Sequence, residues 1–134
     1  MWGRLKYLVL LSVVSCSTSL PVYQLKITGN TIPFPVSNFQ SSDLAIARDD
    51  QAAYDILVIR KAALIYDALF LRCTHDAAAL QATPEQIVCP QCKSVYDLVG
   101  TPKVGPATKP LLRFPTETDN NQGIITINIQ ALKL

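Results

Sequence analysis

The placement of the cysteines and the single histidine constrains the fold of this chain more than any other feature. The 134-residue sequence has four cysteines and one histidine. Three of the cysteines and the histidine form two short pairs, Cys73-Thr-His75 and Cys89-Pro-Gln-Cys92. Thiolates and imidazole are ligands that suit zinc and iron–sulfur clusters. We therefore expect a fold that brings two short loops together around a metal site.

The N-terminal residues have the pattern of a targeting segment. Arg4 and Lys6 precede the run LVLLSVV, which suits a signal-peptide core and is short for a membrane span. A small residue directly before Cys16 resembles a bacterial lipoprotein processing site. We expect residues 1–15 to be a signal peptide and Cys16 to be lipidated, which anchors the protein in the cell envelope, on the periplasmic side or at the outer membrane. The alternative is an ordinary secretory signal, with Cys16 lost or free.

The charge balance argues against several classes of partner. The formal net charge is +2, and Arg4 and Lys6 in the leader account for it. A neutral mature domain has no electrostatic reason to bind nucleic acid or anionic lipid headgroups. Charged residues make up 16% of the chain and hydrophobic ones 49%, which is typical of a folded domain with a modest core.

Short apolar runs between turn-forming residues predict an antiparallel all-β domain. Residues 62–72 fit a helix as well as a buried strand. Residues 30–43 contain Pro33 and Pro35 and read as a loop or an edge strand. We expect residues 16–43 to hold the anchor, a linker and the first strand region, and residues 44–134 to form the domain. Other strands are expected at 23–29, 44–48, 56–60, 86–89, 94–98, 111–115 and 123–130, with a loop at 101–110 and a turn at 116–122.

The two ligand pairs and the residues after them resemble a Rieske-type iron–sulfur domain. That family has a first box C-x-H and a second box C-x-x-H, which hold a [2Fe–2S] cluster through two cysteines and two histidines. Residues 73–75 read CTH, and KSVYDLVG followed by GPA at 105–107 is similar to the second box and its sequel. The resemblance covers about residues 44–129. It implies an all-β, Rieske-like antiparallel sandwich or barrel with the cluster-binding loops at one tip.

The resemblance also implies a ligand set and two hydrogen-bond donors. Cys92 stands where the family has its second histidine. The hydroxyl of Ser94 would donate to a bridging sulfide, and that of Tyr96 to the Cys73 thiolate. Such donors stabilise a reduced cluster. The implied ligands are Cys73, His75, Cys89 and Cys92.

Further departures from the family pattern separate this chain from quinol-oxidising respiratory members. Asp76 replaces an apolar residue often found beside the cluster, and Lys93 replaces a glycine. Ala78 and Gln91 stand where those members have a disulfide that joins the two loops. These differences leave the interpretation as a small electron carrier intact.

The sequence therefore predicts an electron-transfer protein with an unknown redox partner protein, rather than an enzyme in its own right. The alternative is a structural or binding lipoprotein on a Rieske-like scaffold that holds zinc or no metal. Zinc needs no assembly machinery, and the leader lacks the twin arginine of folded export. A third interpretation is a metal-free domain in which Cys89 and Cys92 form a thiol–disulfide pair.

Overall fold

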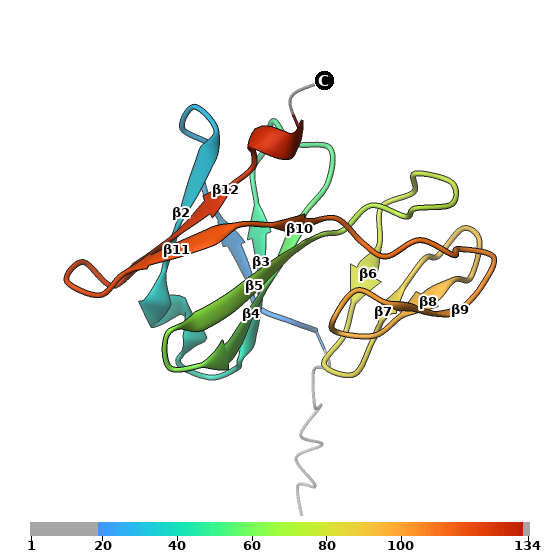
Figure 1. Ribbon diagram of the computed structural model, residues 1–134, viewed down its shortest axis with the longest axis horizontal. Helices are drawn as coiled ribbons and strands as arrows, with labels where there is room; N and C mark the ends of the chain where they lie inside the picture. Colours follow the sequence, from blue (N-terminus) through green and yellow to red (C-terminus); the bar gives the residue numbers. More distant parts are fainter. Residues whose placement is uncertain (1–18, 133–134) are drawn as a thin grey trace, which may run out of the picture.

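Three β-sheets make up the fold in the computed structural model, which describes residues 19–132 (Figure 1). The central sheet has the strand order β1-β3-β4-β5-β10. The expected all-β fold with antiparallel sheets is confirmed, and β1 with β3 is a parallel pair. The central strands are β1 (Val22–Gln24), β3 (Leu44–Arg48), β4 (Ile56–Ala62), β5 (Ile65–Phe70) and β10 (Arg113–Phe114).

The other two sheets lie on either side of the central one (Figure 1). A three-stranded sheet has the order β11-β12-β2, and a four-stranded sheet of very short strands has the order β6-β7-β8-β9. Two 3₁₀ turns, η1 (Val36–Phe39) and η2 (Gln130–Leu132), complete the elements. The outer strands are β2 (Thr31–Pro35), β11 (Thr116–Asp119), β12 (Ile124–Asn128), β6 (Gln81–Ala82), β7 (Ile87–Val88), β8 (Val95–Tyr96) and β9 (Pro102–Val104).

The central sheet is buried on both faces because its residues alternate between two hydrophobic cores. In β3, Leu44 and Ile46 pack in the core shared with the four-stranded sheet. Ala45 and Ala47 pack in the core shared with the three-stranded sheet. Side chains along a strand point to opposite faces in turn, so a strand covered on both sides is a continuous apolar run. The four-stranded sheet is thus packed against one face of the central sheet through a shared hydrophobic core.

Burial on both faces also explains why the sequence of residues 62–72 fits a helix as well as a strand. They contain β5, in which Ala68 faces one core and Leu69 the other. Two expectations from the sequence are wrong in part. The segment 101–110, expected to be a loop, contains the strand β9, and the segment 116–122, expected to be a turn, begins with the strand β11. Both strands are short, and β11 is polar and lies at a sheet edge, so backbone pairing rather than an apolar pattern holds them.

Residues before position 44 contribute to the sheets. The strand β1 pairs with β3, and β2 is an edge strand that pairs with β12. The expected signal peptide and Cys16 lie outside the described residues. Within residues 19–132, no helix has the length and apolar character needed to span a bilayer.

Candidate metal centre

Two loops beside the four-stranded sheet bring three cysteines together. The first loop (residues 73–78) follows β5, and the second loop (residues 89–94) directly follows β7. The Sγ atoms of Cys73 and Cys92 lie 3.6 Å apart. Cys73 is 1% exposed and Cys89 is fully buried, whereas Cys92 is half-buried. All three are free thiols in the structure, so their sulfurs are available as ligands.

The two loops repeat the same backbone hydrogen bonds. In the first loop the N–H of Cys73 donates to the carbonyl of Ala78 (2.8 Å), and the carbonyl of Cys73 accepts from the N–H of Ala77 (3.0 Å). In the second loop Cys89 makes the same two bonds, to the residues five and four positions later (2.9 and 3.0 Å). Ala77 and Lys93, at the fourth position after each cysteine, have positive φ values of 62° and 67°. The loops therefore share one conformation.

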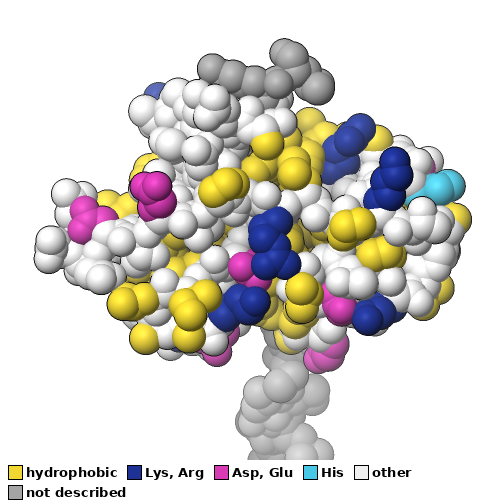
Figure 2. Space-filling model, viewed as in Figure 1, with side chains coloured by type: hydrophobic (Ala, Val, Ile, Leu, Met, Phe, Trp, Pro, Cys, Tyr) yellow, Lys and Arg dark blue, Asp and Glu magenta, His cyan; other side chains and the backbone are white. Residues whose placement is uncertain are grey.

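Four potential ligand atoms converge between these loops. They lie within 4.8 Å of one another and belong to Cys73, Asp76, Cys89 and Cys92. The structure thus brings together three of the four ligands expected from the sequence and adds a carboxylate. The side chain of His75 is exposed on the surface and is not one of these four (Figure 2). Its role as a ligand stays a prediction.

Asp76 is the residue of the group that the sequence reasoning missed. Its Oδ1 accepts a hydrogen bond from the N–H of Ala78 (3.0 Å) and lies 3.6 Å from Cys89 Sγ. The Ala78 N–H is the chief reason that the pKa of Asp76 is lowered, so the carboxyl group is ionised near neutral pH. A signal for it was present, because Cys73-x-x-Asp76 has the same spacing as Cys89-x-x-Cys92.

Ser94 is buried with its hydroxyl against Cys92. The Ser94 Oγ accepts a hydrogen bond from the N–H of Ala107 (2.9 Å) and lies 3.0 Å from Cys92 Sγ. Because the N–H of Ala107 occupies one acceptor site of Oγ, the hydroxyl proton is free to point at the sulfur. This hydroxyl is the main cause of the lowered pKa of the Cys92 thiol.

Tyr96 is also fully buried, and its hydroxyl faces the first loop. The oxygen accepts from the N–H of Thr74 (3.1 Å) and lies 2.9 Å from Thr74 Oγ and 3.6 Å from Cys73 Sγ. Thr74 Oγ donates its own proton to the carbonyl of Lys109 (2.8 Å). The Tyr96 hydroxyl proton can therefore point at Thr74 Oγ or at the Cys73 sulfur. Burial raises the pKa of Tyr96, so it stays protonated and can donate at neutral pH.

The pKa of the buried Cys89 thiol is shifted in the opposite direction to that of Cys92. Burial raises the pKa of Cys89 to about 11. Without metal this thiol is protonated at neutral pH and donates to the Asp76 carboxylate. Because metals bind the thiolate, loading the site must release this proton.

A proline-rich segment, residues 105–110, is bonded to both loops. Ala107 is buried, its N–H bonds to Ser94 in the second loop, and the carbonyl of Lys109 bonds to Thr74 in the first. The Gly105–Pro106 peptide bond in this segment is cis. The segment therefore helps to hold the two loops together.

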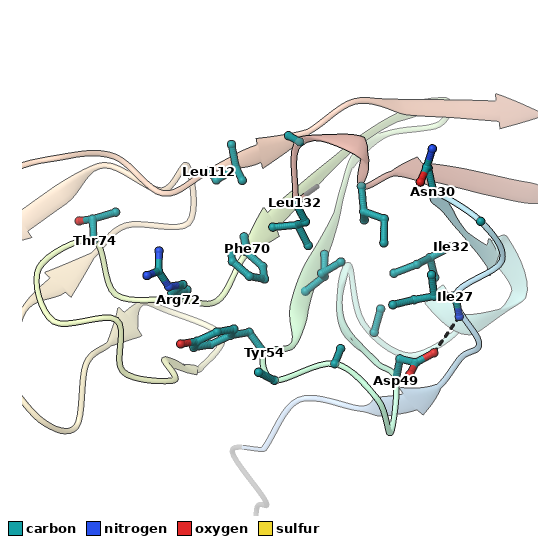
Figure 3. Close-up of a pocket in the computed structure, with 17 residues that line it drawn as sticks. Ile27, Asn30, Ile32, Asp49, Tyr54, Phe70, Arg72, Thr74, Leu112 and Leu132 are labelled. Carbon is teal, nitrogen blue, oxygen red and sulfur yellow. Dashed lines mark hydrogen bonds between the residues drawn. The ribbon is translucent and has the colours of Figure 1, made fainter. Parts of the chain in front are cut away.

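A mostly apolar cavity of about 750 Å³ lies between the central sheet and η2. Tyr54, Arg72 and Thr74 line the end nearest the first loop, and Asn30 lines the far end (Figure 3). The guanidinium of Arg72 lies over the Tyr54 ring, 5.8 Å from its centroid. The Tyr54 hydroxyl donates to the carbonyl of Ala77 (2.7 Å), so this wall of the cavity also braces the first loop.

Comparison with known proteins identifies the fold. No protein-family model matches the sequence, and no curated protein matches it. The structure is similar to a chain of the complex of reduced oxygenase and oxidized ferredoxin in carbazole 1,9a-dioxygenase (22% identity, TM-score 0.53, 75% of this chain and 94% of that chain). It is also similar to the cyanobacterial plasma membrane Rieske protein PetC3 from Synechocystis PCC 6803 (16% identity, TM-score 0.55, 69% and 92% coverage). The chain has the Rieske fold.

A third structure with the Rieske fold supports the same assignment. The ferredoxin of carbazole 1,9a-dioxygenase from Nocardioides aromaticivorans IC177 is 17% identical, with a TM-score of 0.52 and coverage of 72% of this chain and 94% of that one. The fold expected from the two boxes is thereby confirmed. At these identities the similarity shows the fold, and the function has to be inferred from the residues of the site.

Proposed function

We propose that this protein is an electron-transfer protein that carries a [2Fe–2S] cluster. The observation that supports the proposal is the convergence of three cysteine thiols in two matching loops of a Rieske fold. Three soft ligands in one small volume suit iron–sulfur or zinc and disfavour the hard cations magnesium and calcium. An electron carrier with this site passes one electron at a time to a redox partner protein.

The chain's own residues fit this role. Cys73, Cys89, Ser94 and Tyr96 are at most 1% exposed, so water is excluded from one side of the site. Cys92 is half-buried, which leaves a short path for an electron to the surface. The cluster, when bound, supplies the one-electron chemistry. The hydroxyls of Ser94 and Tyr96 supply hydrogen bonds to sulfur, which tune the potential of such centres.

The fourth ligand belongs to the first loop in this proposal. The family resemblance favours His75 and hence Cys3His ligation. The geometry offers Asp76, the only carboxylate in the converging group. Either completes a four-ligand site with the three cysteines.

A second candidate function, a structural zinc protein, is favoured by the compactness of the site. Two thiolates on one tetrahedral zinc ion lie about 3.8 Å apart, given Zn–S bonds of about 2.3 Å. Cys73 and Cys92 are 3.6 Å apart, and the whole group fits within 4.8 Å. A two-iron cluster needs more room than one ion.

Metal analysis of the mature protein separates the two functions. We expect protein prepared under anaerobic conditions to be brown and to contain two iron and two sulfide per chain. It should show a reversible one-electron wave in protein-film voltammetry. A matched pair of variants checks the site: Cys89→Ser should lose the iron, whereas Gln91→Ser, two positions along the same loop, should keep it. Colourless protein with one zinc per chain and no wave would replace electron transfer by the structural zinc function.

We further propose that Cys16 is lipidated and anchors the domain in the cell envelope. The support is the leader pattern of residues 1–16, which lie outside the described residues. We expect mass spectrometry of the membrane fraction to find an acylated N-terminal Cys16, and Cys16→Ser to move the protein to the soluble fraction. A mature protein that starts at another residue would contradict the anchor and leave the electron-transfer proposal unaffected.

A further inference from the structure

We propose that Asp76, and not His75, is the fourth ligand of the metal centre, so that the ligand set is three cysteines and one aspartate. The inference deepens the proposed function, and it applies to an iron–sulfur cluster and to zinc alike. It rests on the matching conformation of the two loops, on the burial of their side chains and on the contacts of the carboxylate.

The shared conformation sets up a residue-by-residue correspondence between the loops. The repeated hydrogen bonds align Cys73 with Cys89, and they align Asp76 with Cys92. Equivalent backbone positions direct their Cβ atoms equivalently. Since Cys92 points toward the other sulfurs, Asp76 must do so as well, and the convergence of their ligand atoms agrees with this.

The burial of the side chains follows the same correspondence. Cys73 and its equivalent Cys89 are buried, and Asp76 and Cys92 are both half-buried. His75 corresponds to Gln91, and both are exposed. The position of His75 is therefore the outward-facing position of this loop type, whereas the position of Asp76 is the inward-facing one.

The contacts of Asp76 are those of a positioned ligand. The N–H of Ala78 holds Oδ1, in the way that outer hydrogen bonds orient a metal-binding carboxylate. The two oxygens lie 3.6 and 3.9 Å from Cys89 Sγ. In the part of the chain that the structure describes, Asp76 forms no ion pair with a lysine or arginine. A carboxylate among three thiols is compensated when a cation binds between them.

Aspartate is chemically competent in this place. Zinc accepts carboxylate oxygen at about 2.0–2.2 Å alongside thiolate sulfur. Replacing a neutral imidazole by a carboxylate makes the site more negative by one charge. The reduced state of a cluster is then less favoured, so we expect a lower potential than Cys3His ligation would give.

Three variants and one spectroscopic measurement test the assignment. His75→Gln gives the first loop the residue that the second loop has at that position, and Asp76→Asn keeps the size of the side chain without its charge. Asp76→Cys makes the two loops equivalent in their ligands. Metal content and apparent metal affinity are measured for each variant. In the wild type, pulsed electron paramagnetic resonance of the reduced cluster detects any nitrogen bound to iron.

We expect His75→Gln to bind metal as the wild type does. Asp76→Asn should lose at least about 100-fold in affinity, because loss of an outer-sphere partner alone costs 10–100-fold. Asp76→Cys should restore binding with an altered absorption spectrum, which also shows that this position tolerates substitution. The reduced wild type should lack the strong coupling of a directly bound nitrogen.

The opposite pattern would overturn the assignment. Metal loss in His75→Gln with retention in Asp76→Asn, or a strongly coupled nitrogen in the wild type, assigns the site to His75. If the wild type holds zinc instead of iron, the same variants are compared by zinc content and by the spectrum of the cobalt-substituted protein. In that case the electron-transfer function fails while the ligand assignment is still decided. A wild type that binds neither metal refutes both.

Discussion

Removal of the metal is expected to unfold residues 71–112 locally while the central sheet stays folded. The strands β6, β7, β8 and β9 in this region have only two or three residues each. Their core includes the side chains of Cys73 and Cys89, which are also the proposed ligands. Segments of about 40 residues or fewer usually need a metal or disulfides to stay folded. Metal binding is therefore expected to contribute a large part of the free energy of unfolding of this region.

The central sheet has a different source of stability. Its strands β3, β4 and β5 have five to seven residues and bury apolar side chains on both faces. One of its two cores is shared with β2 and β12, far from the cysteines. Losing the metal removes neither that core nor the pairing of the long strands, so the two regions should open separately.

Hydrogen–deuterium exchange of the metal-loaded and the chelated, reduced protein measures this difference. We expect amides of residues 71–112 to lose at least about 100-fold in protection, which corresponds to about 2.7 kcal/mol. Amides of β3, β4 and β5 should change little. Cys89→Ser should reproduce the pattern without a chelator, and Gln91→Ser should not. Equal loss of protection in both regions would show that the molecule unfolds as one unit.

The sequence was sufficient for the parts of the site that depend on residue type and spacing. Cys73, Cys89 and Cys92 stand out because soft ligands in short pairs are rare. Asp76 did not, because carboxylates are common on surfaces, and the spacing that Cys73-x-x-Asp76 shares with Cys89-x-x-Cys92 does not by itself show that the carboxylate faces inward. Only the matching hydrogen bonds of the two loops show that it takes the position equivalent to Cys92.

Contacts between segments that are distant in sequence could not be predicted either. Ser94 and Thr74, whose hydroxyl lies against that of Tyr96, have partners in a segment more than ten residues away, namely the N–H of Ala107 for Ser94 and the carbonyl of Lys109 for Thr74. The family resemblance pointed to hydroxyls near the cluster. The direct contact of Ser94 with Cys92 Sγ depends on how the proline-rich segment folds back. In the same way, β11 is formed by pairing with β12 and carries no apolar pattern of its own.

Gly100 is expected to be more sensitive to substitution than Gly105, the other glycine of residues 71–112. It has a φ of +89°, and a Cβ at this position would lie 3.3 Å from Leu111 Cβ and 3.4 Å from Leu69 Cδ2. Gly100→Ala should therefore suffer backbone strain of about 1–2 kcal/mol. Crowding against two buried leucines should add about 1–3 kcal/mol. Together these effects lower the free energy of unfolding by about 2–5 kcal/mol.

The surrounding turn cannot move aside to relieve this crowding. The carboxylate of Asp97 accepts hydrogen bonds from the N–H groups of Val99 (3.0 Å) and Thr101 (2.9 Å), on either side of Gly100. The carbonyl of Gly100 also accepts from the N–H of Leu111 (2.9 Å). The glycine is thus held against the leucines that join the four-stranded sheet to the central one.

Gly123→Ala is the matched control, because Gly123 has a φ of +63° and no atom within 4 Å of an added Cβ. It should show the backbone strain alone, about 1–2 kcal/mol. Urea denaturation of the metal-loaded variants gives both values, and Gly100→Ala should exceed the control by about 1–3 kcal/mol. Equal losses would mean that Leu69 and Leu111 yield to the extra methyl group. The packing between the four-stranded sheet and the central sheet would then be looser than their buried side chains indicate.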